Sequence, residues 1–206
     1  MCTSRRLYRY EKGASLAVTL VMLIIVLLLA TSSTSEALMG ERAARNERDR
    51  VIALHAAEFA LSDAELDIEN SSAPESRSAI FSPRSTEGFS GSCGQGEGNI
   101  YQGLCSNINN YPIVPWLTTD IANSSTNSSS VRFGRFTGQT MPHNGGPLPA
   151  QLPRYIIELM MDNTPGQSAD AHYMYRVTAI GFGSGIGTQV VVQSIYRKSD
   201  NQEYSP

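Results

Sequence analysis

The longest hydrophobic run of the chain lies close to its N-terminus. Residues 13–35 carry no charged side chain, and residues 14–30 (ASLAVTLVMLIIVLLLA) are apolar apart from Ser15 and Thr19. About 20 apolar residues cross a bilayer as a helix. Each Leu, Ile or Val near the bilayer centre contributes roughly −0.3 to −0.6 kcal/mol to insertion. The pattern therefore predicts a transmembrane helix over residues 14–35.

The residues before this run determine its expected orientation. A single acid, Glu11, stands among four basic residues, Arg5, Arg6, Arg9 and Lys12. This positive bias keeps residues 1–13 in the cytoplasm and sends the rest of the chain outward. A cleavable signal peptide is one alternative, but the run exceeds the 7 to 15 apolar residues of such peptides and a helical pattern resumes after it. A plain uncleaved anchor is another.

Residues 36–70 contain no proline and only one glycine, and most of them are strong helix formers. They therefore predict an amphipathic continuation of the helix. An apolar stripe recurs at steps of three and four, and we expect it to pack on a sheet: Leu54, Ala57, Leu61, Ala64 and Ile68. The acidic residues fall mostly off this stripe: Glu58, Asp63, Glu65 and Asp67. The mixed charges of residues 41–50 indicate a solvated face or charge pairs between subunits.

Turn formers end the helical pattern at Asn70, and short strand-like runs follow further on. These runs cover residues 131–136, 155–161, 173–182 and 189–196. Four glycines separate the last two runs, where positive φ angles would close a hairpin: Gly181, Gly183, Gly185 and Gly187. The polar tract 123–130 (NSSTNSSS) is typical of an exposed loop. We expect an α+β fold in which the long N-terminal helix packs on a C-terminal antiparallel sheet, with residues 71–206 as an extracytoplasmic head.

The composition of the chain argues against two classes of function, nucleic-acid binding and metal binding. The chain has 206 residues, a net charge of −3 and a pI near 5.6, which argues against a nucleic-acid partner. Export places Cys93 and Cys105 in an oxidising compartment, so we expect them to form a disulfide that contributes about 2 to 4 kcal/mol. Cys2 lies in the leader and is left unpaired. The Cys and His residues show no zinc spacing, so we predict no metal site.

Catalytic motifs are missing from the sequence. The segment GFGSGIG lacks the GxGxxG spacing and a Walker lysine, and a strand-like run follows it, so we interpret it as a turn. No GxSxG elbow surrounds Ser90 or Ser184. We therefore expect no enzyme, no catalytic residues and no cofactor.

The residues Lys12-Gly13-Ala14-Ser15-Leu16 resemble the prepilin peptidase site of the type IV pilin superfamily. The resemblance implies cleavage between Gly13 and Ala14 and N-methylation of Ala14. It also draws attention to Val18, because major pilins carry a glutamate there that is thought to pair with the N-terminal ammonium of a neighbouring subunit. A buried carboxylate is tolerable only when it is paired. A subunit with valine is therefore suited to the pilus tip.

Within the superfamily, the helix resembles PilX-type minor pilins. The resemblance rests on Asn46, Asp49 and Arg50, on the segment 54–65, and on Gly103-Leu104-Cys105. It implies a minor pilin that helps to initiate assembly and forms part of a tip complex, in a pilus that serves twitching motility, adhesion or DNA uptake. The implied partners are other minor pilins, the major pilin, a PilY-type tip adhesin and prepilin peptidase. The implied location is the inner membrane with the head in the periplasm, and then the pilus tip.

Three alternatives remain open from the sequence. A K-type pseudopilin of a type II secretion system also lacks the glutamate, although that family usually carries a large helical insertion. A single-pass anchored periplasmic binding domain would have an uncut N-terminus. An exported enzyme would require a pocket with converging titratable groups.

Overall fold

The computed structural model describes residues 13–106, 114–162 and 172–198, and for residues 31–35 it describes the backbone alone. The expected leader up to Lys12, with Cys2, lies outside these ranges. The chain divides into two compact units, Met1–Asn46 and Glu47–Pro206. We refer to the second unit as the head unit.

One helix, α1 (Ala14–Glu69), covers both segments that the sequence predicts as helical. It begins directly after Gly13 and ends where Asn70 and Ser71 replace strong helix formers. Its N-terminal side chains from Leu16 to Leu29 are exposed and apolar. Among the helices that the structure describes, none combines the length and the apolar character that a membrane crossing requires.

The head unit contains a five-stranded sheet. Strands β3 (Arg154–Met161), β4 (Tyr173–Phe182) and β5 (Gln189–Tyr196) form the antiparallel meander that the sequence predicts. Strand β1 (Leu104–Ser106) pairs with β3 in parallel, so the sheet is mixed rather than wholly antiparallel. Strand β2 (Val131–Arg132) is shorter than expected and also pairs with β3. The path of the sheet is β1-β3-β4-β5.

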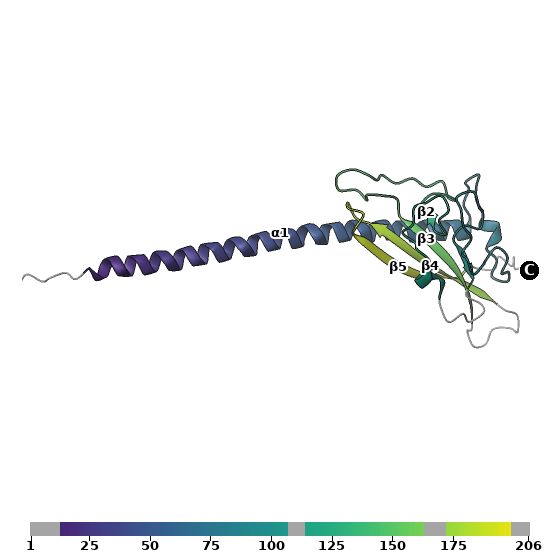
Figure 1. Ribbon diagram of the computed structural model, residues 1–206. Helices are drawn as coiled ribbons and strands as arrows, with labels where there is room; N and C mark the ends of the chain where they lie inside the picture. The colour runs from purple at the N-terminus through teal and green to yellow at the C-terminus, as the bar shows by residue number, and fades with distance from the viewer. Residues whose placement is uncertain (1–12, 107–113, 163–171, 199–206) are drawn as a thin grey trace, which may run out of the picture. The chain divides into compact units, whose positions relative to one another are not determined.

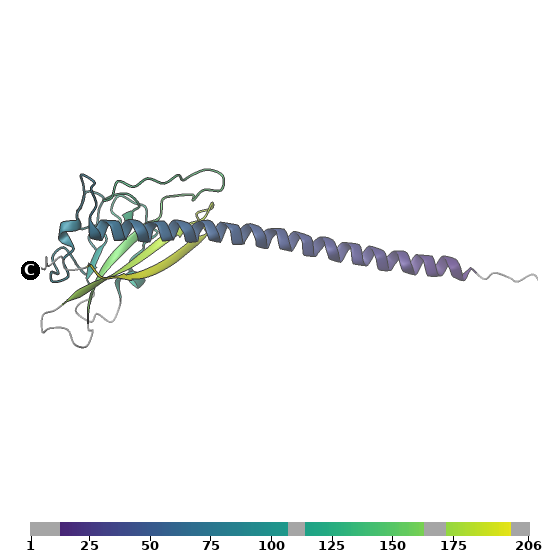
Figure 2. The same ribbon diagram turned by 180° about the vertical axis from the view of Figure 1, so that it is seen from behind.

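Helix α1 and the disulfide region cover opposite faces of this sheet. Figures 1 and 2 show the C-terminal part of α1 lying across the strands. One core joins Ala60, Ala64 and Ile68 of α1 to alternate residues of β3 such as Tyr155 and Ile157. A second core on the other face gathers the disulfide and several apolar side chains: Cys93, Cys105, Ile121, Ile156, Ile180 and Phe182. Two short helices, η1 (Ser78–Ile80) and α2 (Pro115–Thr118), lie in the connecting segments.

The buried face of α1 contains three residues of the predicted apolar stripe, Ala57, Ala64 and Ile68, and it extends beyond them. It consists largely of alanines and two aspartates, and it includes Ala53, Ala56, Ala57, Ala60, Asp63 and Asp67. Leu54 is exposed instead. Small side chains let the helix backbone approach the sheet closely, which explains why most residues of the buried face are alanines.

The glycines between β4 and β5 were expected to supply positive φ angles, and this expectation is wrong. None of the four glycines of the segment 181–187 has a positive φ. A Cβ on Gly181 would lie 2.1 Å from the carbonyl oxygen of Ala53, and a Cβ on Gly183 would lie 2.6 Å from the Asp49 carboxylate. Gly181 therefore allows β4 to lie close to the backbone of α1, and Gly183 leaves room for the Asp49 side chain. Neither glycine is required by the geometry of the turn.

Candidate functional site

The N-terminal part of α1 presents apolar side chains around its whole circumference. Gly13 precedes the helix with open space around it, and Ala14 is the first helical residue. Val18 is 58% exposed, like its apolar neighbours. The hydroxyl of Thr19 donates to the carbonyl of Leu16 at 2.9 Å, so its polar group is satisfied within the helix. This surface can be covered by lipid or by other apolar helices.

A buried ion pair joins α1 to the loops of the head unit. Arg77 donates to both carboxylate oxygens of Asp67, at 2.7 to 3.1 Å. It also donates to the carbonyls of Ile100 and Gln102, at 2.8 and 2.6 Å. Both charged side chains are fully buried. Such a pair stabilises a fold only when its hydrogen bonds are complete, as they are here.

Aromatic side chains complete the surroundings of this ion pair. The Arg77 guanidinium lies 3.8 Å from the centre of the Phe136 ring, within the range of a cation–π contact. The Tyr155 hydroxyl donates to Asp67 at 2.9 Å, and burial, followed by the charge of Asp67, raises the pKa of Tyr155 well above its ordinary value. Tyr155 therefore stays protonated and connects β3 to the ion pair.

Asp63 connects α1 to a second loop. Its carboxylate accepts hydrogen bonds from the backbone N–H of Gly134, at 2.8 Å, and from the Thr137 hydroxyl. Burial raises the pKa of Asp63 despite these two hydrogen bonds. The sequence pattern placed Asp63 and Asp67 off the buried face, but both side chains are buried. Hydrogen-bond donors inside the head make this burial possible.

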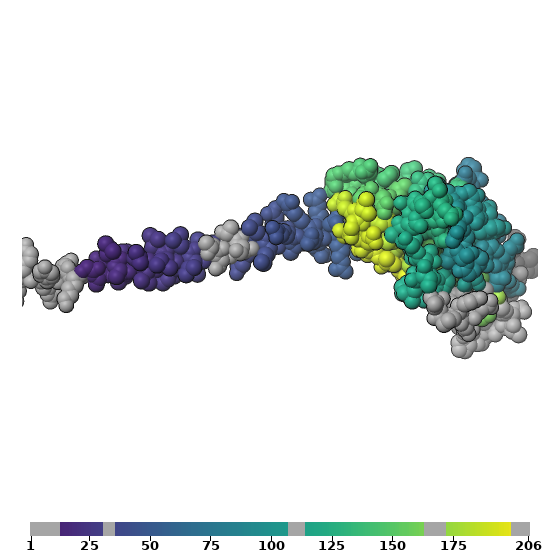
Figure 3. All heavy atoms as spheres, viewed as in Figure 1, coloured from purple at the N-terminus to yellow at the C-terminus, as the bar shows by residue number. Residues whose placement is uncertain are grey.

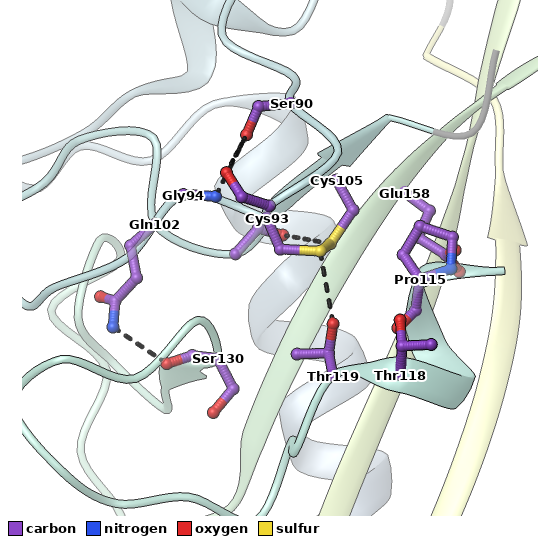
Figure 4. The surroundings of a disulfide bond; sticks show 12 residues. Ser90, Cys93, Gly94, Gln102, Cys105, Pro115, Thr118, Thr119, Ser130 and Glu158 are labelled. Carbon is purple, nitrogen blue, oxygen red and sulfur yellow. Dashed lines mark hydrogen bonds between the residues drawn. A yellow bond between two sulfur atoms is a disulfide. The ribbon is translucent and has the colours of Figure 1, made fainter. Parts of the chain in front are cut away.

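The structure joins Cys93 and Cys105 in a disulfide, as predicted, and their Cα atoms are 4.0 Å apart. Figure 4 shows the bond beside Thr119, whose hydroxyl lies 3.5 Å from the Cys93 sulfur. The disulfide thereby holds the loop before β1 to β1 itself, and Thr119 at the end of α2 contacts the bond.

Residues 123–127 of the polar tract are exposed, as predicted, but Ser128 and Ser130 at its end are buried, contrary to the prediction. Gln102 donates from its amide to the carbonyls of Ser128 and Ser130, both at 3.0 Å. Ser130 also accepts a hydrogen bond from Arg154 at 2.7 Å. The serines are tolerated inside because each polar group has a partner.

Two family models match the chain. The model described as PilX N-terminal matches residues 12–61, and the model described as Type IV pilus assembly protein PilX C-term matches residues 101–198. The chain belongs to the PilX family of type IV pilus assembly proteins. No curated protein and no solved structure was found to match it.

One contact joins the two regions that the PilX models match. Asp49 of α1 accepts hydrogen bonds from the backbone N–H and the hydroxyl of Ser184, at 2.5 and 2.6 Å. Hydrogen bonds from the side chains of Ser184 and Thr188 lower the pKa of Asp49. Asp49 is part of the sequence that resembles PilX-type helices, and it fixes the turn between β4 and β5.

The PilX-family head also carries an apolar groove of about 440 Å³ between α1 and the loop after β2. One stripe of the helix forms its floor: Ile52, His55, Ala56 and Phe59. Phe133, Met141 and three prolines of the segment 142–149 are among the residues of its other wall. Phe59 is 57% exposed, so this groove is an apolar surface open to solvent.

Two histidines of this PilX-family chain, His55 and His143, have ordinary partners. His55 lies 3.1 Å from Glu58 in the next turn of α1, and His143 lies 3.3 Å from the carbonyl of Met141. In the part of the chain that the structure describes, no three His, Cys, Asp or Glu side chains are placed to hold a metal ion.

Proposed function

We propose that this chain is a minor pilin that helps to initiate assembly of a type IV pilus and forms part of its tip complex. The observation that carries the proposal is the match of PilX models to both ends of the chain, combined with the apolar α1. The head, with its disulfide, ion pair and sheet, is a stable module that contributes contacts to neighbouring subunits.

The first step is processing in the inner membrane. Residues 14–35 hold the subunit in the bilayer, residues 1–13 face the cytoplasm, and prepilin peptidase cuts between Gly13 and Ala14. Methylation of Ala14 follows. The open space around Gly13 and the start of α1 at Ala14 support this proposal, because a peptidase needs access to the scissile bond.

Assembly then replaces lipid with protein around the same apolar surface. The side chains from Leu16 to Leu29 pack against the N-terminal helices of other minor pilins and of the major pilin. Val18 offers no carboxylate to the ammonium of a neighbouring subunit, which suits a place at the tip. There the heads of the complex present a PilY-type adhesin.

The composition of the head favours this proposal over a K-type pseudopilin. Beyond α1, the helices of the described residues are α2 with four residues and η1 with three. The large helical insertion that is usual in the K-type family is therefore not found in the described ranges.

The experiment that tests the proposal is determination of the N-terminal residue and mass of the membrane-derived protein, with and without active prepilin peptidase. We expect an N-terminus at Ala14, carrying one methyl group and dependent on the peptidase. A protein that begins at Met1, or directly after Ala30 or Ala37, would contradict the proposal. Such a result would indicate an anchored or secreted periplasmic domain.

A further inference from the structure

Strand β5 forms a free edge of the sheet. It has eight residues, it follows β4 at the end of the strand order, and no other described strand pairs with it. Figure 3 shows β5, in yellow, on the surface of the head unit. Proteins usually protect such edges, because unpaired backbone N–H and C=O groups recruit strands from other chains.

The usual protections are missing from β5. Its sequence, QVVVQSIY, contains no charged residue and no proline. Its register with β4 runs without a bulge from the Phe182↔Gln189 pair to the Tyr175↔Tyr196 pair. At the opposite side of the sheet, β1 has three residues and β2 has two. Among the described strands, only β5 thus offers a long, uncharged edge without a bulge.

The hydrogen-bond pattern shows which groups β5 offers. The N–H of Gly183 donates to the carbonyl of Thr188 at 2.8 Å, which marks these two facing residues as a hydrogen-bonded pair. Hydrogen-bonded and non-hydrogen-bonded pairs alternate along an antiparallel ladder. Val191, Gln193 and Ile195 therefore turn their N–H and C=O groups away from β4.

The side chains of the same residues add an apolar component. Val191 is 52% exposed and Ile195 is 63% exposed, and both lie on the sheet face opposite α1. Between them, the Gln193 amide donates to the Thr178 hydroxyl at 2.9 Å, so it lies across the sheet and leaves the edge open. Over the segment 191–195, the edge thus presents three backbone donor–acceptor sets and two branched apolar side chains.

We propose that β5 is a docking edge for an extended, uncharged segment of another protein of the pilus, which adds a strand to the sheet. The proposal rests on the proposed function of a pilus subunit. The segment forms main-chain hydrogen bonds with Val191, Gln193 and Ile195. Its alternate side chains are apolar where they lie beside Val191 and Ile195.

A second copy of this chain fits the edge chemically but not geometrically. Antiparallel pairing of β5 with β5, centred on Gln193, would place Val191 of each copy opposite Ile195 of the other. This pairing turns one copy by a half-turn within the plane of the sheet, so residues 47–69 of the two α1 helices would run in opposite directions. Two copies of one chain in a polar filament point the same way, so a half-turn that reverses residues 47–69 is not available to them.

Residue-resolved hydrogen exchange tests the proposal. The amides of Val191, Gln193 and Ile195 are compared between the purified full chain in detergent and the same chain in sheared pili. We expect exchange at these three amides to slow at least about tenfold in pili. The amides of Val190, Val192 and Ser194 point toward β4 and serve as internal references that are protected in both samples.

The outcomes separate this proposal from the proposed function. A chain that is present in pili, with unchanged exchange at the three amides, overturns the docking edge alone. A chain that is absent from pili overturns the proposed function and the docking edge with it. Disulfide-linked homodimers of a Gln193→Cys variant, in a Cys2→Ser background, would show that the occupant is a second copy and would also overturn the proposal.

Two variants test the edge independently. Gln193→Pro removes an outward N–H at an edge position where proline is tolerated, and Ile195→Lys adds an edge charge. We expect each to lower the ratio of this chain to the major pilin in pili by about tenfold. Ile100→Lys changes an exposed apolar residue of the disulfide loop and should leave the ratio unchanged. Trp116 fluorescence during urea unfolding checks that each variant folds, and an unchanged ratio for both edge variants would overturn the proposal.

Discussion

At the scale of single residues, Arg77 binds several buried polar groups of the head at once. Its guanidinium reaches Asp67 on α1 and the carbonyls of Ile100 and Gln102 in the disulfide loop. Every buried side-chain nitrogen and oxygen of the described residues has a hydrogen-bond partner. A change at Arg77 would leave the Asp67 carboxylate buried without its counter-charge.

We therefore predict that Arg77→Met destabilises the head by about 3 to 5 kcal/mol, the usual cost of removing one member of a buried ion pair. The measurement is urea unfolding of the full chain, followed by the fluorescence of Trp116, which packs against the core that contains the disulfide. Arg45→Met is the matched control, because Arg45 pairs with Glu41 on the exposed helix surface. The control should cost less than about 1 kcal/mol. Equal effects of the two variants would show that the Arg77 ion pair does not stabilise the head.

The sequence could not assign these roles to Asp63, Asp67 and Arg77. Charged residues on an amphipathic helix usually face water, so the pattern assigned both aspartates to the outer surface. Their burial depends on donors that lie at least ten residues away in sequence, namely Arg77, Thr137 and the backbone of Gly134. Such pairing is visible only after the loops are placed in space.

At the scale of elements, the packing of α1 on β4 depends on Gly181. A Cβ there would lie 2.1 Å from the carbonyl oxygen of Ala53 and 2.4 Å from the backbone nitrogen of Ala57. Both atoms belong to the helix backbone and cannot move aside like a flexible side chain. A larger residue at position 181 therefore cannot fit unless α1 and β4 move apart.

We predict that Gly181→Ala lowers the free energy of unfolding by about 1 to 3 kcal/mol, as overpacking of a core does. Gly185→Ala is the control, because a Cβ at Gly185 meets nothing within 4 Å and its φ is not positive. Urea unfolding of both variants, again followed by Trp116 fluorescence, measures the difference. Similar stability of the two variants would be evidence against the close contact.

The elements themselves could be predicted from the sequence much better than their contacts. Alternating or β-branched runs identified β3, β4 and β5, and an apolar run followed by strong helix formers without proline identified α1. The parallel strand β1 was missed because three residues are too few to show a period. The glycines of the segment 181–187 correctly indicated the connection between β4 and β5, but not through positive φ angles. At Gly181 and Gly183, glycine is required because α1 lies too close for a Cβ atom.

At the scale of the whole molecule, we infer from the proposed function that position 18 determines whether the subunit lies at the tip or in the body of the pilus. Val18 lies in an apolar helix surface, where an introduced carboxylate is tolerated only when it is paired. In the pilus body, the N-terminal ammonium of a neighbouring subunit would supply that pairing. A carboxylate introduced at this position should therefore be accepted in the body.

We predict that Val18→Glu raises the number of copies of this chain per pilus and disperses them along the filament, with loss of tip-dependent adhesion. Quantitative immunoblots of sheared pili against the major pilin, together with immunogold labelling, measure both effects. Val21→Glu is the matched control, because it introduces the same acid one helical turn away, where no ammonium partner is expected. That variant should lower incorporation, since its carboxylate stays unpaired among apolar helices. If Val18→Glu leaves the copy number and the labelling unchanged, position 18 does not determine where the subunit lies in the pilus.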